Sequence, residues 1–278
     1  MSKKTKDERY SADDLPPAKN KILYAYRCFI KLFMIGFFSV GAMFIAIVCF
    51  PVMMIFIHPH EKFRKAARTF ISGSFVMFTN FLRIMGGARF TFHDKEKYKD
   101  LRSKIIVANH PSLLDVVYII SVVPHADCIV RGGLTHSPFV GIIKQLYIVN
   151  TLGTEEMMEL SAKSLAAGNN LIVFPEGTRT PRHGTNPFKR GAARIALETH
   201  SDIQMIYIGG NDKYGLGKHD AFFSYNKSEE YHYDVHLLDQ IHISEYDGVE
   251  SQIAARRITE KMHDEIAKAA LEVDGRVL

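Results

Sequence analysis

The first residues in this sequence that could do chemistry are Asn109 to Asp115, which read NHPSLLD. They follow a short apolar run typical of a strand, and a proline keeps the residue before it out of the helical region. We therefore expect His110 at a corner of the chain, with Pro111 in the first turn of the next helix. Asp115 then lies about one turn further on, within reach of the imidazole. A histidine that a carboxylate orients can act as a general base, although the motif supplies no nucleophile.

The spacing between the two residues predicts little by itself. The chain has 13 histidines, and the same His-x4-Asp spacing recurs at His242 and Asp247. The context differs, because His110 follows a strand and precedes an apolar helix, whereas His242 lies in the charged stretch HISEYD. The context favours His110, and a purely structural role for it stays open at this point.

A second motif, FPEGTRT from Phe174 to Thr180, follows another apolar run. Gly177 permits a close approach of the backbone, and Arg179 offers a planar fork that matches phosphate or carboxylate. Glu176 can accept hydrogen bonds from hydroxyl groups. Such a loop is suited to a polar head group. The alternative is a loop in which Glu176 and Arg179 merely pair with each other.

Taken together, the two motifs resemble the glycerolipid acyltransferases of the 1-acylglycerol-3-phosphate (lysophosphatidate) acyltransferase type. That family is marked by an NHxxxxD block and, about sixty residues later, by FPEGTRS. Here Glu176 lies 66 positions after His110. The segments RGGLTHSPFVG, from Arg131, and PFKRGAARIAL, from Pro187, also look like stretches of the family. The resemblance covers roughly residues 89–210.

The resemblance implies a role for each motif residue. His110 would be the general base for an acceptor hydroxyl, and Asp115 would orient its imidazole. The hydroxyl would attack an acyl thioester directly, which explains why the chain offers no nucleophile. The donor would be acyl-CoA or acyl carrier protein (acyl-ACP), with no bound cofactor and no metal. The default acceptor would be 1-acylglycerol-3-phosphate, a lysophospholipid, and its head group would be held by Glu176, Gly177, Thr178 and Arg179.

Two departures from the family pattern concern the acceptor. Where such enzymes commonly carry an Asp-Arg pair after a short strand, this chain has Tyr147 to Asn150, and the run IQMIYIGGN lacks the usual proline. Three alternatives therefore stay open. The chain could acylate another specialised lipid, hydrolyse acyl thioesters, or be a non-catalytic membrane-associated binding protein of the same fold.

An apolar run precedes these motifs. Leu32 to Ile57 contains 26 residues without a charge, and a helix of that length measures about 39 Å, against about 30 Å for the hydrocarbon core of a bilayer. Pro51 can kink it. Basic residues flank both ends, so the positive-inside rule does not orient it. The amphipathic stretch Lys62 to Met85 could complete a hairpin in one leaflet, or it could be a core helix of the globular part.

The charge distribution points to a membrane. Residues 1–92 carry 14 Lys and Arg against 5 Asp and Glu, although the whole chain has a net charge of only +5. Basic charge beside an apolar segment favours an anionic membrane surface over nucleic acid as the partner. The three cysteines show no paired spacing, which indicates a reducing compartment. We expect a membrane protein with its catalytic domain on the cytoplasmic side.

The rest of the sequence predicts an α/β fold, with a mixed sheet flanked by helices. The expected organisation is a mobile basic tail (1–21), membrane-anchoring helices (22–86) and an α/β acyltransferase domain (87–278). His232 and His236 would share one face of a late strand, but they lack a third metal ligand at a sensible spacing. The expected strands are 89–93, 104–108, 127–131, 171–174, 203–209 and 231–238. The expected helices are 112–122, 138–146, 155–167, 188–198 and 250–271.

Overall fold

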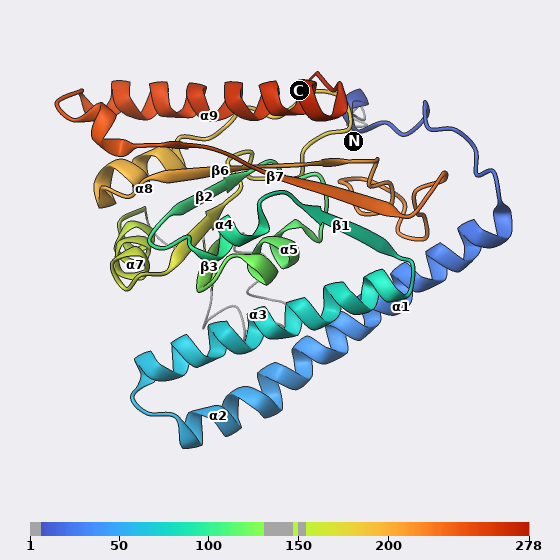
Figure 1. Ribbon diagram of the computed structural model, residues 1–278, viewed down its shortest axis with the longest axis horizontal. Helices are drawn as coiled ribbons and strands as arrows, with labels where there is room; N and C mark the ends of the chain where they lie inside the picture. The colour runs from blue at the N-terminus through green and yellow to red at the C-terminus, as the bar shows by residue number, and fades with distance from the viewer. Residues whose placement is uncertain (1–6, 131–146, 150–153, 278) are drawn as a thin grey trace, which may run out of the picture.

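The computed structural model describes residues 7–130, 147–149 and 154–277 (Figure 1). A seven-stranded sheet separates two layers of helices. Helices α7 (Thr154–Ala166), α8 (Gly191–Thr199) and α9 (Ser251–Asp274) cover one face. Helices α3 (His60–Ile84) and α5 (Asp115–Val122) cover the other. The predicted α/β class, with helices on both sides of a sheet, is confirmed.

The sheet is mixed, as expected. Its strand order is β1-β7-β6-β2-β5-β3-β4, and every neighbouring pair is parallel except β6 and β7. The strands are β1 (Ala88–Phe92), β2 (Ile105–Ala108), β3 (Ala126–Val130), β4 (Tyr147–Val149), β5 (Asn170–Val173), β6 (Ile203–Gly210) and β7 (Tyr231–Ile241).

The central strands explain where the two motifs meet. Every residue of β2 and β5 is buried, as expected for parallel strands covered on both faces. The two strands are parallel neighbours, with Val107 beside Val173. Their carboxyl ends therefore lie at the same edge of the sheet, and NHPSLLD and FPEGTRT leave the sheet side by side.

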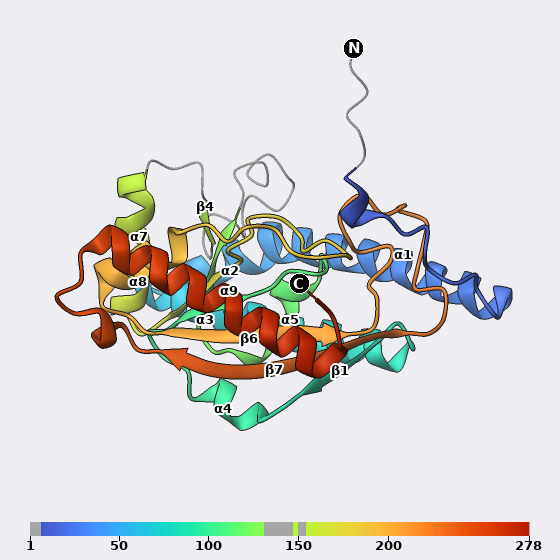
Figure 2. The same ribbon diagram turned by 90° about the horizontal axis from the view of Figure 1, so that it is seen from above.

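Strand β7 has two different faces. Tyr231, Tyr233 and Val235 are buried in the core under α3 and α5. The alternate residues are less buried and point to the opposite face, the side on which α9 packs along β6 (Figure 2). The strand expected at 231–238 is thus present, and its alternating burial is typical of a strand with one buried face.

Helix α5 begins later than expected. It starts at Asp115, not at Ser112, so Pro111 lies before the helix and not in its first turn. The Asp115 carboxylate accepts a hydrogen bond from the Ser112 N–H, and the Ser112 hydroxyl accepts one from Leu114 N–H. These bonds hold residues 112–114 in a turn that precedes the helix.

The helices α7, α8 and α9 begin and end within a few residues of the expected bounds, and three further elements are present. The structure contains α4 (Lys95–Lys99) and two 3-10 turns, Glu8–Tyr10 and Ile243–Tyr246, that the sequence did not indicate. The helix expected at 138–146 lies outside the described residues.

The N-terminal apolar run forms one arm of a helical hairpin. Helix α1 (Lys21–Phe44) leads through a π-helical turn (Ile45–Cys49) into α2 (Phe50–Phe56), and α3 returns beside them (Figure 1). The antiparallel direction follows from three ring pairs, Phe33 with Phe81, Phe38 with Phe75, and Phe50 with Phe63.

The proline in this arm does not end the helix. Pro51 lies directly after the π-helical turn, in the first turn of α2. A proline inside a helix cannot donate its hydrogen bond and its ring crowds the carbonyl four residues back. The wider preceding turn accommodates the ring, which lets the helical segment Lys21–Phe56 run on.

Candidate active site

His110 and Asp115 form a hydrogen-bonded pair. His110 Nδ1 lies 2.7 Å from Asp115 Oδ2. The Asp115 side chain is fully buried, whereas 20% of the His110 side chain is exposed. Because Nδ1 faces the carboxylate, Nε2 is the ring atom left to meet a substrate.

Two further residues fix the carboxylate. Ser112 donates its N–H to Asp115 Oδ2 at 2.8 Å and its hydroxyl to Oδ1 at 2.5 Å. Tyr233, from β7, donates its hydroxyl to Ser112 Oγ at 2.9 Å. Ser112 lies within the motif, but Tyr233 is 121 residues away, so sequence reasoning missed its contribution.

A buried lysine lies behind these residues. Lys213 Nζ is 4.6 Å from the centroid of the Tyr233 ring and donates to the carbonyls of Gly209, Asn211 and His232. Burial lowers the pKa of Lys213 to about 8, although Asp115 favours its charged form. No motif in the sequence marks this residue.

The backbone of His110 is held by the second motif. His110 N–H donates to Thr180 Oγ1 at 2.8 Å, and Thr180 N–H donates to the His110 carbonyl at 2.7 Å. The His110 ring stacks on Phe174, with the ring centroids 4.2 Å apart. The strand-end loops after β2 and β5 thus position the imidazole together.

Glu176 holds the loop that carries it. Thr180 donates its hydroxyl to one carboxylate oxygen, and Asn186 donates its backbone N–H (3.1 Å) and its side-chain amide (2.9 Å) to the other. Burial raises the pKa of Glu176. In the part of the chain that the structure describes, no ion pair joins Glu176 to Arg179. Glu176 does accept from a hydroxyl, but that hydroxyl belongs to Thr180.

Arg179 points toward another loop. Its Nη1 donates to the carbonyls of Leu216 and Gly217, both at 2.9 Å. Thr178, beside it, is partly exposed. Gly177 has a left-handed φ of +63°, and a Cβ there would lie 2.7 Å from Lys189 Nζ. Lys189 therefore adds a second positive charge at this loop, which the motif itself did not indicate.

The loop that Arg179 holds is also tied to the N-terminal hairpin. Lys31 of α1 is 4% exposed. Its Nζ donates to the carbonyls of Gly215 (3.3 Å), Phe222 (2.6 Å) and Ser224. One loop is thereby fixed from two sides, by the hairpin and by the second motif.

A large apolar cavity of about 900 Å³ lies between the hairpin and the α/β domain. Helices α1 and α3 line most of it. Leu113 and Leu114, in the turn between His110 and Asp115, line it as well. The cavity therefore reaches the turn that carries the histidine and the aspartate.

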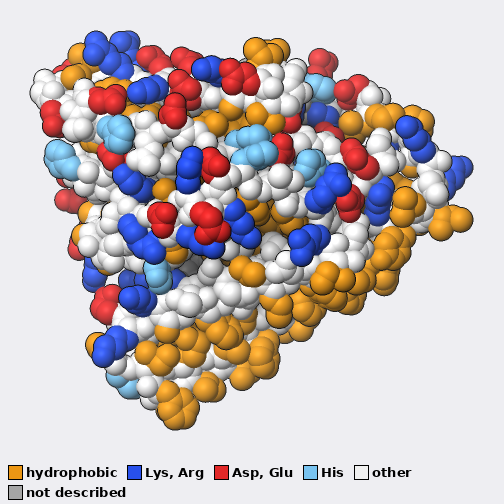
Figure 3. Space-filling view, viewed as in Figure 1, with side chains coloured by type: hydrophobic (Ala, Val, Ile, Leu, Met, Phe, Trp, Pro, Cys, Tyr) orange, Lys and Arg blue, Asp and Glu red, His pale blue; other side chains and the backbone are white. Residues whose placement is uncertain are grey.

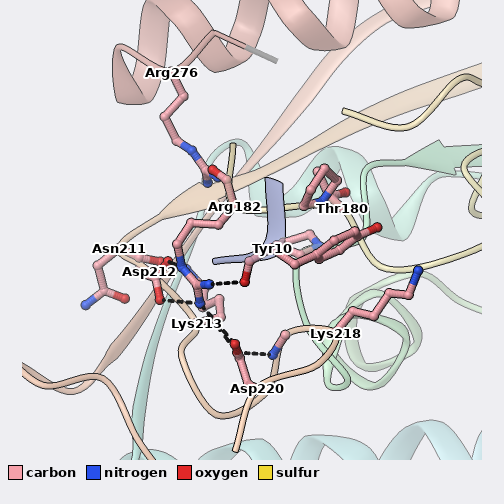
Figure 4. Close-up of a pocket in the computed structure, with 12 residues that line it drawn as sticks. Tyr10, Thr180, Arg182, Asn211, Asp212, Lys213, Lys218, Asp220 and Arg276 are labelled. Carbon is pink, nitrogen blue, oxygen red and sulfur yellow. Dashed lines mark hydrogen bonds and ion pairs between the residues drawn. The ribbon is translucent and has the colours of Figure 1, made fainter. Parts of the chain in front are cut away.

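A second, small cavity of about 30 Å³ is lined by Thr180, Arg182 and Asp212, among other residues (Figure 4). Arg182 forms ion pairs there with Asp212 (2.6 Å) and Asp220 (3.3 Å). It also donates to the carbonyl of Tyr10 at 3.1 Å, and the Tyr10 hydroxyl donates to the Arg179 carbonyl at 3.0 Å. Residues 7–11 are therefore docked on the second motif, while the mobile tail expected for residues 1–21 stays a prediction.

Residues 89–209, which contain both motifs, match the family model described as Acyltransferase. The chain is similar to this family over the matched residues, which make up less than half of its length. It is 27% identical over 165 residues to human 1-acyl-sn-glycerol-3-phosphate acyltransferase beta, which covers 56% of this chain and 59% of the human protein. It is 23% identical over 206 residues to the 1-acyl-sn-glycerol-3-phosphate acyltransferase of Borreliella burgdorferi, covering 70% and 78%.

A solved structure has the same fold as this chain. The crystal structure of the 1-acyl-sn-glycerophosphate (LPA) acyltransferase PlsC from Thermotoga maritima superposes with a TM-score of 0.64 and 20% sequence identity, covering 92% of this chain and 97% of that one. The family match contains all six site residues predicted from the sequence, His110, Asp115, Glu176, Gly177, Thr178 and Arg179. Lys31 and Tyr233 lie outside it.

Proposed function

We propose that this chain transfers an acyl group from a thioester to the hydroxyl of a lysophospholipid, with 1-acylglycerol-3-phosphate as the default acceptor. The observation that carries the proposal is the paired His110 and Asp115, which lies between an apolar cavity and a loop bearing Arg179. The relatives named as 1-acyl-sn-glycerol-3-phosphate acyltransferases support it.

The chemistry needs only a base and two substrates. His110 Nε2 takes the proton of the acceptor hydroxyl as its oxygen attacks the thioester carbonyl. The C–S bond then breaks, and the imidazolium returns the proton to the leaving thiolate. Asp115 holds the imidazole in position through Nδ1 and stabilises its charged form. No covalent enzyme intermediate forms.

The head group of the acceptor is assigned to the second motif. The guanidinium of Arg179 uses Nη1 for backbone carbonyls, which leaves the other edge of its fork for an anion. Lys189 adds charge beside Gly177, and its side chain occupies the space that a Cβ at Gly177 would take. Glu176 and Thr180 keep this loop in register with His110.

The acyl chain of the donor is assigned to the apolar cavity. A cavity of about 900 Å³ lined mainly by apolar side chains stabilises a fatty acyl chain by removing it from water. Leu113 and Leu114 bring its wall to the base. The carrier of the thioester, coenzyme A or acyl carrier protein, stays outside, and both are donors in this proposal.

The hairpin is assigned to a membrane. The helical segment Lys21–Phe56 is long and apolar enough to cross a bilayer, and only 11% of its most apolar window is buried. Apolar side chains cover the side of the hairpin that faces away from the domain (Figure 3). They include Phe29, Val40, Ile47, Phe56, Met77 and Ile84. Phe222 and Phe223, on the loop that Lys31 holds, are exposed too.

The hairpin is further assigned to one leaflet. Residues 7–11 dock on the loop after β5, and β1 follows α3 directly, so both ends of the hairpin join the same domain. A single crossing would place these ends on opposite sides of the bilayer. Lys62, Arg64 and Lys65 in α3 oppose a second crossing. The domain is assigned to the cytoplasmic side, with Cys28, Cys49 and Cys128 all free.

One observation favours a different acceptor. The Asp-Arg pair common in such enzymes is replaced by Tyr147 to Asn150, and Asn150 lies outside the described residues. The test is to incubate membranes containing the protein with acyl-CoA or acyl-ACP and a panel of lysolipids, and to identify products by mass spectrometry.

Each outcome of that panel is informative. A diacyl product from 1-acylglycerol-3-phosphate supports the default acceptor, and a product from another lysolipid identifies the alternative. Thioester consumption that does not depend on acceptor would indicate hydrolysis instead. No product with any acceptor would contradict the proposal and leave a binding protein of the same fold.

A further inference from the structure

A cluster of two histidines and one aspartate lies where β1 ends beside β7. His93 follows β1, while Asp234 and His236 belong to β7, and one ligand atom from each lies within 4.8 Å of the others. His93 Nε2 is 2.7 Å from Asp234 Oδ1, and His236 Nε2 is 3.1 Å from Oδ2. The two imidazole rings are stacked, with centroids 4.1 Å apart.

Strand register brings these residues together. Strands β1 and β7 are parallel, with Phe92 beside Val235. His93 N–H continues the ladder by donating to the Val235 carbonyl at 3.0 Å, so His93 falls beside His236. The sequence pattern offered only His232 and His236, because His93 is 141 residues away from Asp234.

The cluster lies on the face of the sheet opposite the base. Tyr233 reaches Ser112 under α5, so its neighbour Asp234 points to the other face. His236 lies beside Tyr207 of β6, whose hydroxyl donates to Asp274 of α9. The cluster is therefore separate from the acyl-transfer site, and the exposed His93 opens it to solvent.

The nitrogen of His236 marks a place for a ligand. His236 Nε2 is shielded from solvent and has no hydrogen-bond partner among the described residues, although Asp234 Oδ2 is 3.1 Å away. Two imidazole nitrogens and a carboxylate are a donor set that zinc prefers, with a fourth position left for water. The neighbouring His232 is different, because Thr91 Oγ1 lies 3.1 Å from its Nε2.

We propose that His93, Asp234 and His236 bind a divalent transition metal ion of the zinc type. Among the described strands, β1 is at the edge of the sheet and pairs only with β7. The ion joins the end of β1 to β7 across a long stretch of sequence, and because the site exists only in the folded chain, the ion adds its binding free energy to the folded state. Because β1 follows α3 directly, the ion strengthens the attachment of the hairpin to the domain.

The test titrates Co²⁺ and Zn²⁺ into the full chain, purified in detergent without a histidine tag. The wild type should bind one equivalent of Co²⁺ with the visible absorption of a four-coordinate site, lose it to Zn²⁺, and melt at a higher temperature with Zn²⁺ present. His236→Gln and His93→Gln should each weaken Zn²⁺ binding by about tenfold or more. His93→Gln is the safer variant for folding, since its side chain is half exposed.

His232→Gln is the matched control, because it removes a histidine from the same face without removing a proposed ligand. It should bind Co²⁺ as the wild type does. The proposal is overturned if the wild type shows no saturable Co²⁺ site, if both ligand variants bind as tightly as the wild type, or if His232→Gln weakens binding equally. These readouts do not depend on acyl transfer, so they stand apart from the proposed function.

Discussion

Two segments of this chain share the His-x4-Asp spacing and form different structures. In the first, His110 Nδ1 meets Asp115 at 2.7 Å, and the carboxylate is fully buried. In the second, His242 Nδ1 lies 3.2 Å from Asp202 instead of Asp247, and 56% of its side chain is exposed. The same spacing therefore produces a partly buried, oriented imidazole in one place and an exposed imidazole that meets a different carboxylate in the other.

The difference comes from the residues that come after each histidine. After His110, Ser112 donates its N–H and hydroxyl to Asp115, and these bonds hold the carboxylate next to His110 Nδ1. After His242, a 3-10 turn (Ile243–Tyr246) intervenes and Asp202 accepts the Ile243 N–H at 3.0 Å. A base needs a carboxylate that neighbouring donors hold in place, and spacing alone does not supply them.

The sharpest test removes each histidine in turn. His110→Ala should lower kcat/KM for acyl transfer by about 10²–10⁴-fold, because a general base contributes that much. His242→Ala should leave kcat/KM unchanged. Its partner Asp202 pairs with Lys104, which precedes β2, whereas the candidate site lies after the carboxyl end of β2. Steady-state assays on the two variants, with circular dichroism to check folding, make the comparison. A loss of activity only in His242→Ala would reverse the assignment.

The next test changes the carboxylates. Asp115→Asn keeps the size of a fully buried side chain but no longer stabilises the imidazolium, so kcat should fall by about 10²-fold or more. Asp247→Asn should have no effect on kcat. Equal activity of Asp115→Asn and the wild type would mean that the carboxylate does not orient the base.

Arg179, in the loop after β5, allows a smaller and more specific test of the proposed head-group binding. Arg179→Lys keeps the positive charge but loses the planar fork and one of the two bonds to the 216–217 carbonyls. We expect KM for the acceptor to rise by about tenfold, with kcat little changed. A kcat loss without a KM change would place Arg179 in the chemical step instead.

The hydrogen bond from Tyr233 to Ser112, which in turn donates to Asp115, can be removed separately. Tyr233→Phe removes only the hydroxyl that holds Ser112. A hydrogen bond within a charged network makes a modest contribution, so kcat should fall by about tenfold or less. Tyr246→Phe, in the turn after His242, is the matched control and should change nothing. The pH profile of kcat should shift in Tyr233→Phe if the hydroxyl acts through the imidazole.

The pH dependence of stability gives a last comparison of the two segments. The first segment has a buried lysine near it, Lys213, which packs against the Tyr233 ring. Burial depresses the pKa of Lys213 to about 8, below the value of 10.5 expected in the unfolded chain. Between pH 8 and 10.5 the unfolded state holds more protons, so this group makes the folded state more stable as pH rises. Lys213 should contribute up to about 1 kcal/mol of stability per pH unit there, whereas Cys128 and Tyr98, whose pKa values burial raises, contribute in the opposite direction. Lys213→Met should lose this gain, as measured by urea unfolding at pH 8 and pH 9.

Local sequence patterns predicted the residues of the candidate site better than they predicted the distant residues that hold those residues in place. The apolar runs of β2 and β5 and the alternation in β7 were readable because burial imposes them directly. The roles assigned to His110 and Arg179 stay predictions, but the structure brings their loops together. Tyr233 and Lys31 were missed because their partners lie on distant strands and loops. Helix α5 started late because Ser112 used its hydrogen bonds to hold Asp115.

The contacts of Lys31 have a consequence for the position of the candidate site relative to a membrane. Lys31 fixes the loop at Gly215 and Phe222 to α1, and Arg179 grips the same loop at Leu216. If α1 rests in the leaflet, Arg179 and His110 stand at a constant height above the acyl chains, set by the protein and not by the bilayer. The fixed positions of Arg179 and His110 would then favour lipids in which the distance between the free hydroxyl and the phosphate matches the distance between the two side chains.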